Sequence, residues 1–178
     1  MYFAKKYCWL LLFFLIASCG NNLLPSGTDE RAQVQPDTVG PEVGQKAPDF
    51  AVSDTNGGTV TLSSALASKR GVVLYFTMWC PICDSHMTQM VNTAVPAYPD
   101  VRFFAVDYVS GTVADAAAAQ AANGFLALPV LADTEHTLLE GYRATMGTTV
   151  VIDNAGMIRM NEDYSNGSRL QAVLAGLP

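Results

Sequence analysis

The sequence predicts an α/β fold with a central mixed β-sheet, helices on either side of it, and an added N-terminal β-hairpin. Apolar, strand-like segments alternate with segments of helical periodicity from about residue 71 onward, which is typical of parallel strands joined by helices. Turn sequences at 55–58 and 153–156 each separate two short strand-like segments, and such turns predict antiparallel hairpins.

The first elements in chain order are the hairpin, a short helix and the central strand. Strands are expected at 51–54 and 59–62, around the turn Thr55-Asn56-Gly57-Gly58. Ser63 or Ser64 can cap a short helix that runs to Ser68, because a hydroxyl accepts hydrogen bonds from the first backbone N–H groups of a helix. The apolar segment VVLYF at 72–76 then predicts a buried strand.

The later elements alternate between helices and strands. Helices are expected at 84–98, 113–122, 134–142 and 169–175, and strands at 101–106, 128–132, 148–152 and 157–160. The expected boundary residues are Pro96 and Pro99 after the first helix, Asn123-Gly124 after the second, Asp133 or Thr134 before the third, and Ser168 before the last.

The first 18 residues have the features of a signal peptide. Lys5 and Lys6 precede an apolar segment at 8–16 that is too short to span a bilayer. The sequence LIASC that follows resembles a bacterial lipobox, in which Cys19 would be the lipidated N-terminus; an ordinary signal peptide with a chance cysteine is the alternative. We therefore expect a lipoprotein of the bacterial envelope that faces the periplasm, and Gly20 slightly favours the outer membrane.

The mature chain is expected to be a tether followed by one domain. Residues 19–42 are rich in polar residues, proline and glycine, which is typical of a flexible tether, and residues 43–178 form the domain. Half of all residues are hydrophobic, which is enough for a core, and we expect a monomer. The net charge of −6 argues against nucleic acid as a partner.

Two cysteines remain for the folded domain once the leader is removed and Cys19 is lipidated. Cys80 and Cys83 flank Pro81 and Ile82 at the start of a predicted helix, where they can close a small disulfide ring. The helix N-terminus stabilises a thiolate on Cys80. A redox-active pair is favoured over a structural disulfide, because so short a loop constrains the unfolded chain little.

Several segments together resemble the thioredoxin fold in its redoxin form. They are GQKAPDF at 44–50, the turn at 56–58, WCPIC at 79–83 and VVIDNAGMI at 150–158. This AhpC/TSA superfamily contains the peroxiredoxins and the envelope thiol-disulfide oxidoreductases of the TlpA and ResA type, to which the chain is most similar. The resemblance extends over about 43–177 and implies a thiol-disulfide oxidoreductase whose partners are protein cysteines and a second redox protein.

Two positions differ from the pattern of that fold. The cis-proline that usually faces the active-site disulfide is replaced by Gly147, preceded by Met146, so substrate docking is expected to differ. Thioredoxins also carry a buried acid six residues before the first cysteine, where this chain has Leu74. A proton acceptor for the second thiol must therefore lie elsewhere, unless water takes that role.

The expected mechanism is thiol-disulfide exchange. Cys80 attacks a partner disulfide, and Cys83 then resolves the mixed disulfide. Trp79 either forms an apolar wall beside the sulfur or belongs to the core. Pro81 and Ile82 bring no charge to the ring, which favours a middling or low reduction potential.

A peroxidase is the main alternative function. Thr77 stands three residues before Cys80, as in peroxiredoxins, but Val73 replaces their proline and Arg143 is the nearest candidate for their arginine. No cofactor is expected for either function.

Copper binding is a weaker alternative, and we expect no metal. Cys80, Cys83 and His86 have ligand-like spacing, with Met78, Met87 and Met90 as soft neighbours. However, 141–152 contains no histidine, and His136 comes too early in the sequence to replace it.

Overall fold

A seven-stranded mixed sheet organises residues 38–178, the part of the chain that this computed structural model describes. Its strand order is β2-β1-β5-β4-β3-β6-β7, with β3, β4 and β5 parallel and the other pairs antiparallel. The strands are β1 (Ala51–Asp54), β2 (Thr59–Thr61), β3 (Gly71–Thr77), β4 (Val101–Asp107), β5 (Val130–Ala132), β6 (Thr148–Asp153) and β7 (Ile158–Asp163). The predicted fold class is confirmed.

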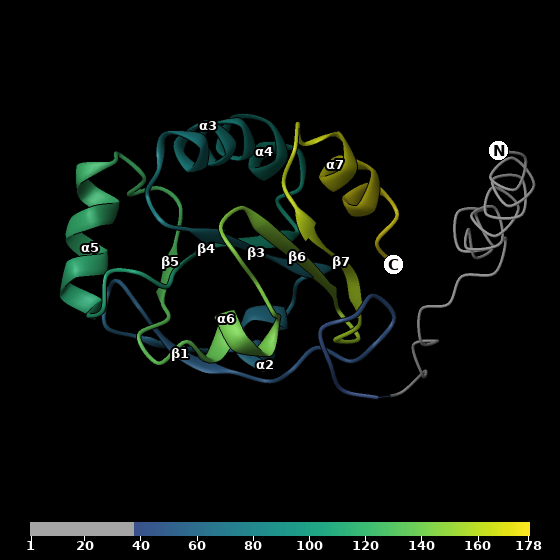
Figure 1. Ribbon diagram of the computed structural model, residues 1–178. Coiled ribbons are helices and arrows are strands. Elements are labelled where there is room, and N and C mark those ends of the chain that lie inside the picture. The colour runs from purple at the N-terminus through teal and green to yellow at the C-terminus, as the bar shows by residue number, and fades with distance from the viewer. Residues whose placement is uncertain (1–37) are drawn as a thin grey trace, which may run out of the picture. The chain divides into compact units, whose positions relative to one another are not determined.

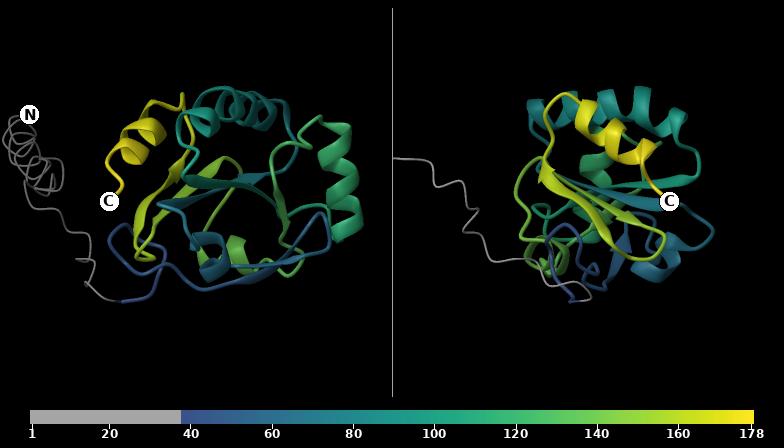
Figure 2. Two further views of the ribbon diagram at one scale, coloured as in Figure 1. Left: turned by 180° about the vertical axis from the view of Figure 1, so that it is seen from behind. Right: turned by 90° about the vertical axis from the view of Figure 1, so that its right-hand side faces the viewer.

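Helices cover both faces of the sheet (Figures 1 and 2). α3, α4 and α7 lie on one face, α2 and α6 lie on the other, and α5 stands near β5. The helices are α2 (Leu62–Leu66), α3 (Pro81–Gln89), the π-helical turn η2 (Met90–Ala94), α4 (Val95–Ala97), α5 (Val113–Ala122), α6 (Thr137–Gly141) and α7 (Ser168–Ala175). Within residues 38–178, none of the helices has the length and apolar character needed to cross a membrane.

β3 is the centre of this arrangement and is buried along its whole length. Because successive side chains of a strand point to opposite faces, Leu74 and Phe76 belong to the core cluster beneath α2 and α6, whereas Val73 and Tyr75 belong to the cluster beneath α3 and α7. Cys83 is part of that second cluster. The continuous apolar segment at 72–76 is therefore the signature of a strand with both faces covered.

The helix after the cysteines differs from the prediction at its start and in the role of Pro96. α3 begins at Pro81 rather than at residue 84, because Cys80 is its N-cap and a proline is well suited to the first helical position. Pro96 does not end the helix but lies inside α4. The intervening turn η2 is π-helical, and Val95 N–H donates to Met90 O, five residues back. This widened turn brings the chain to a proline without breaking the helix.

Two predicted capping residues are replaced by their neighbours. Thr61, not Ser63 or Ser64, caps α2: its hydroxyl accepts from Ser64 N–H at 3.1 Å, and Ser64 Oγ accepts from Thr61 N–H at 3.0 Å. Ser168 is the first residue of α7, and Asn166 Oδ1 accepts its backbone N–H at 3.1 Å. Both differences arise because neighbouring hydroxyl and amide side chains offer equivalent acceptors.

α6 and the last strands also have shifted limits. α6 begins at Thr137 rather than at residue 134, yet the Asp133 carboxylate accepts from Leu138 N–H at 3.1 Å and from Leu139 N–H at 2.8 Å. β5 begins only after Pro129, which lacks the N–H that a strand pair requires. β7 continues to Asp163, three residues beyond its predicted end at 160, because it pairs along the whole of β6.

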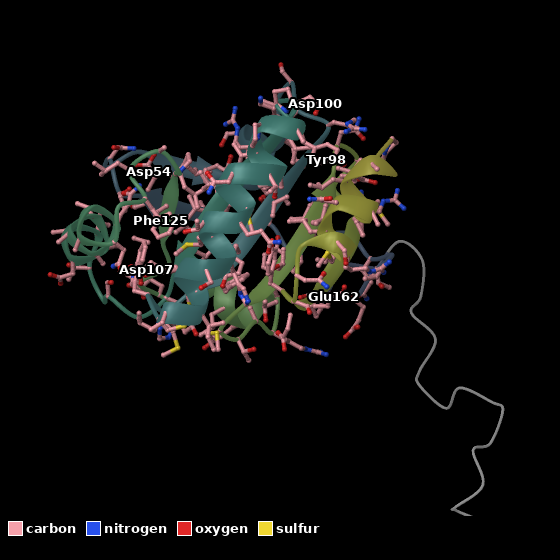
Figure 3. All side chains as sticks on the ribbon, turned by 90° about the horizontal axis from the view of Figure 1, so that it is seen from above. Asp54, Tyr98, Asp100, Asp107, Phe125 and Glu162 are labelled. Atoms are coloured by element: carbon pink, nitrogen blue, oxygen red, sulfur yellow. A yellow bond between two sulfur atoms is a disulfide. The ribbon has the colours of Figure 1, made fainter. Side chains whose placement is uncertain are left out.

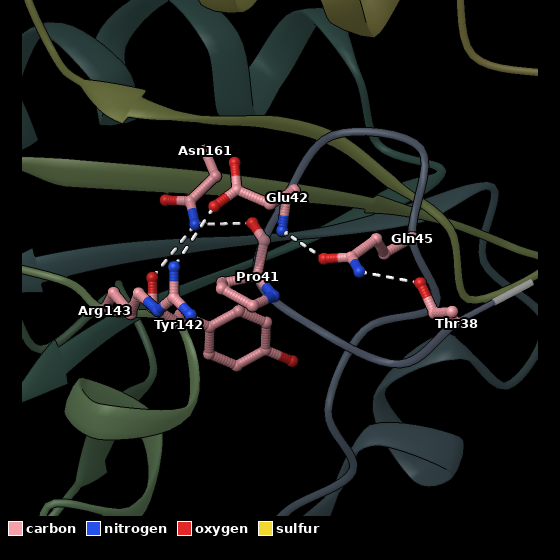
Figure 4. Close-up of polar contacts among 7 residues, drawn as sticks. All are labelled: Thr38, Pro41, Glu42, Gln45, Tyr142, Arg143 and Asn161. Atoms are coloured by element: carbon pink, nitrogen blue, oxygen red, sulfur yellow. Dashed lines mark hydrogen bonds and ion pairs between the residues drawn. The ribbon is translucent and has the colours of Figure 1, made fainter. Parts of the chain in front are cut away.

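Residues 38–46 lie against the domain (Figure 4). Gly44 N–H donates to Ile158 O at 2.9 Å, and Asn161 Nδ2 donates to the carbonyl oxygens of Pro41 at 2.8 Å and Tyr142 at 2.9 Å. The predicted leader at 1–18, Cys19 and the predicted tether up to residue 37 lie outside the described residues.

Candidate active site

The sharp turn after β3 places the cysteines at the start of α3. Thr77, the last residue of β3, is fully buried, and its hydroxyl accepts from Trp79 N–H at 3.1 Å. Trp79 has a φ of 57°, a left-handed conformation that non-glycine residues rarely adopt. This conformation redirects the chain within three residues, from a buried strand to a helix whose first turn is partly exposed.

Cys80 and Cys83 form a disulfide, and their Cα atoms are 5.0 Å apart. Cys80 is partly exposed, whereas Cys83 is completely buried on the inner side of α3. Cys83 N–H donates to Cys80 Sγ at 3.2 Å. In the reduced protein the same helix N-terminus would favour the thiolate of Cys80. The pair therefore has one accessible sulfur and one inaccessible sulfur, as the predicted attacking and resolving roles require.

The surface beside the disulfide is apolar. Met78 is 45% exposed and Ile82 is 57% exposed, and Pro81 is exposed between the cysteines. Met146, from the loop before β6, packs partly buried against the cluster that contains Cys83. These residues bring no charge next to Cys80.

Trp79 packs partly into the core and is held by a hydrogen bond. Its ring packs, partly buried, against the Cys83 cluster, and its indole Nε1 donates to Asp107 Oδ2 at 2.7 Å. Asp107, labelled in Figure 3, is buried at the end of β4 and also accepts bonds from Val109 N–H, Ser110 N–H and Ser110 Oγ. The sequence analysis missed Asp107, although an acid at the carboxyl end of a central parallel strand was an available signal.

Gly147 lies beside the end of β3. Its N–H donates to Phe76 O at 2.9 Å, its carbonyl accepts from Tyr164 N–H at 2.8 Å, and its φ is 86°. Glycine adopts this backbone conformation without strain. The segment before β6 is thus fixed next to the active-site turn by backbone hydrogen bonds.

The ring of His86 on α3 packs against the rings of Tyr75 and Tyr164. The Tyr75 hydroxyl is 3.1 Å from His86 Nδ1, and the ring centroids of His86 and Tyr164 are 4.7 Å apart. Burial raises the pKa of Tyr75 far above its usual range and lowers the pKa of His86. The polar partner of His86 in this structure is thus a tyrosine hydroxyl. Residues 38–178 contain no cluster of three His, Cys, Asp or Glu side chains suited to a metal ion.

The candidate peroxidase arginine lies in a different environment. The Arg143 side chain is 74% exposed and pairs with Glu42 at 3.4 Å, next to the segment at 38–46 (Figure 4). The Thr77 hydroxyl is engaged with the backbone of the turn. No contact in this structure joins Arg143 to Thr77 or Cys80 among the described residues.

The AhpC/TSA family model matches residues 43–161. The chain belongs to the AhpC/TSA family. Among curated proteins, this family member is similar to thioredoxin-like protein YneN of Bacillus subtilis strain 168, with 24% identity over 156 residues that cover 87% of each chain.

Solved structures agree with this assignment. A candidate protein disulfide isomerase from Bacteroides thetaiotaomicron matches with a TM-score of 0.64 and 26% identity, over 75% of this chain and 87% of that one. The exposed lipoprotein thioredoxin Etrx1 of Streptococcus pneumoniae strain TIGR4 matches with a TM-score of 0.57 and 26% identity, over 71% of this chain and 98% of that one. The predicted superfamily is confirmed, and this AhpC/TSA protein is an oxidoreductase of the thiol-disulfide type.

Proposed function

We propose that the protein exchanges electrons with the cysteines of other proteins through Cys80 and Cys83. The observation that carries this proposal is the disulfide at the N-terminus of α3, with Cys80 partly exposed and Cys83 buried. A client sulfur can approach Cys80, whereas only an intramolecular reaction can use Cys83.

The reaction has two steps in the direction that reduces a client. The Cys80 thiolate attacks the client disulfide, which releases one client thiolate and forms a mixed disulfide. Cys83 then attacks Cys80 Sγ, the bond to the client breaks, and the second client thiolate leaves. Two electrons pass to the client, and the Cys80–Cys83 disulfide is restored. A second redox protein must then reduce that disulfide. When the cycle runs in reverse, the client thiols reduce the disulfide, and the second redox protein accepts two electrons from the resulting Cys80 and Cys83 thiols.

A trapping experiment tests the division of labour between the cysteines. Cys83→Ser should accumulate a mixed disulfide with a client peptide, because the resolving thiol is missing. Both variants also carry serine in place of Cys8 and Cys19, so that only the pair can react. Cys80→Ser should accumulate none, because the remaining cysteine, Cys83, is buried. Equal trapping by the two variants would contradict the assignment, and a wild-type protein that exchanges no thiols would refute the function.

We further propose that the protein is exported and anchored to the envelope, facing the periplasm, through a lipid on Cys19. The support is the LIASC sequence before the tether and the similarity to a lipoprotein thioredoxin. Metabolic labelling with a radioactive fatty acid should mark the wild-type protein and not Cys19→Ala, which should appear in the soluble fraction. A labelled Cys19→Ala protein would overturn the anchor.

A further inference from the structure

The buried position of Cys83 creates a need for an internal proton acceptor. Its thiol must lose a proton before it can attack Cys80, and Cys83 has no exposed surface. Leu74, at the position of the usual buried acid, packs in the cluster on the opposite face of the sheet. The following inference rests on the proposed thiol-disulfide exchange and concerns which residue takes this proton.

Three buried carboxylates are already fully used by the fold. Asp107 accepts four hydrogen bonds from Trp79 and the loop after β4. Asp133 accepts two backbone N–H groups of α6, one on each oxygen. Asp153 accepts two backbone N–H groups of the β6–β7 turn and pairs with Arg159. These acids have structural partners, so none of them is suited to exchange a proton with a thiol.

Asp84 differs from these three. Its Oδ1 is buried, and it is the one carboxylate oxygen within residues 38–178 that is buried without a hydrogen-bond partner. A buried acceptor without a donor is costly, and native proteins rarely retain one without a reason. A thiol that becomes available only when the disulfide opens would supply the missing donor.

Asp84 also lies next to the redox pair. It directly follows Cys83, and its N–H donates to Cys80 O at 2.9 Å, one helical turn away. Burial, followed by the nearby charges of Tyr164, Tyr108 and Asp84, raises the pKa of Tyr75. Tyr75 shares a buried cluster with Cys83.

We propose that Asp84 is the general base for Cys83. During resolution the Asp84 carboxylate takes the proton of the Cys83 thiol, the resulting thiolate attacks Cys80 Sγ, and the client thiolate leaves with the electron pair of the broken bond. Asp84 then releases the proton to water or to the client thiolate. In the reverse direction protonated Asp84 returns a proton to the Cys83 thiolate as the disulfide opens.

The titratable groups around the pair leave a clear pH window for the test. Tyr75 on β3, Tyr108 after β4 and Tyr164 after β7 all have a pKa raised by burial, and the pKa of His86 on α3 is lowered by burial. The carboxylate of Asp107 at the end of β4 is fully hydrogen-bonded. None of the three tyrosines or His86 changes its charge between about pH 7 and pH 9, which leaves thiol ionisation as the change to observe.

The experiment follows the two phases of the reaction of the reduced full chain with an aromatic disulfide reagent. Cys8 and Cys19 are replaced by serine in every variant, so that only the pair reacts. The first phase releases one chromophoric thiolate as the mixed disulfide forms on Cys80, and the second phase releases another as Cys83 resolves it.

Asp84→Asn should slow the second phase about 100-fold near pH 7, the usual order of a general-base contribution, and leave the first phase within about twofold. Without the base, the second-phase rate should rise about tenfold per pH unit, because it follows the thiolate fraction of Cys83. The wild-type rate should be nearly independent of pH in this range. Asp84→Glu, which keeps a carboxylate, should retain a flat profile.

Two controls make the outcomes decisive. Glu135→Gln removes the same charge at an exposed position and should behave as wild type. His86→Gln tests the other ionisable group on the same helix, and a pH-dependent loss there but not in Asp84→Asn would overturn the assignment. A loss in Asp84→Asn of equal size at every pH, indicating a structural role, would overturn it as well. A wild-type protein without any second phase would instead refute the proposed function.

Discussion

Replacing Asp107 with asparagine should loosen the turn that carries the redox pair. Asp107 is 2% exposed, and its Oδ2 accepts from Trp79 Nε1 at 2.7 Å and from Ser110 Oγ at 2.5 Å. Asparagine keeps one acceptor oxygen but presents an NH2 group in place of the other. That NH2 group cannot accept a hydrogen bond from the indole. In the variant, the NH2 group and the Trp79 Nε1–H would therefore be two donors that face each other without an acceptor.

The magnitude follows from the number of bonds lost. Hydrogen bonds to a charged group contribute about 1.5–3 kcal/mol each, and Oδ2 receives two of them. Trp79 is partly exposed, so water can replace part of the loss. We therefore expect the free energy of unfolding to fall by about 2–3 kcal/mol in Asp107→Asn.

Tryptophan fluorescence during urea unfolding provides the assay. The chain has two tryptophans, and Trp9 lies in the predicted leader, so in a chain that starts after residue 18 the signal reports Trp79 alone. Glu135→Gln is the matched control and should shift stability by less than about 0.5 kcal/mol. An Asp107→Asn midpoint equal to that of wild type, with an unchanged slope, would refute the reasoning.

Three further predictions concern the surroundings of the site. Gly71→Ala should destabilise the domain by more than about 2 kcal/mol in urea unfolding, because a Cβ there would lie 2.7 Å from the backbone oxygen of Ile152 on the paired strand β6; a change below about 0.5 kcal/mol would contradict this. The lowered pKa of His86 means that the unfolded chain binds its proton more readily, so stability should fall as pH decreases from about 7 through the lowered pKa; this part of the decrease should be absent in His86→Gln. Asn161→Ala removes the two hydrogen bonds that the Asn161 side chain on β7 donates to Pro41 O in the segment at 38–46 and to Tyr142 O after α6, and should speed amide hydrogen exchange of Gly44 while that of β3 stays unchanged.

The parts of the fold that depend on local patterns were predictable from sequence. The apolar segment at 72–76 indicated a buried strand, and the CxxC sequence was placed at the start of the helix that follows it, as the structure shows. The start of α3 was missed even though Pro81 is a strong first-turn signal. Pro96 was misread because a π-helical turn, which has no simple sequence signature, carries the helix past it.

The site residues that were missed depend on tertiary contacts. Asp107 contacts Trp79 because β3 and β4 pair with Thr77 opposite Asp107. The indole donor and the carboxylate acceptor are 28 residues apart in the sequence. Whether Asp84 Oδ1 has a hydrogen-bond partner depends on all the groups that surround it in the fold. No pattern along the helix could therefore indicate that this oxygen has none. The two cysteines could therefore be selected from the sequence, whereas Asp107 and Asp84 could be selected only from the structure.

Ile82, between Pro81 and Cys83, provides a direct test of what sets the reduction potential of the cysteine pair. Ile82 is 57% exposed in the first turn of α3, so a side chain there can change without altering the core. In Ile82→His an imidazolium would lie near the Cys80 thiolate and stabilise the reduced form, which makes the pair a stronger oxidant. A stabilisation of about 1.4 kcal/mol corresponds to a rise of about 30 mV in a two-electron couple.

Equilibration with a glutathione buffer near pH 6 should show this rise, and above about pH 8 the rise should shrink because the imidazole is then neutral. Ile82→Gln, which is polar but uncharged, is the control. A potential in Ile82→His that equals that of Ile82→Gln near pH 6 would mean that charge beside Cys80 does not set the balance, and the argument from the apolar Pro81-Ile82 pair would fail.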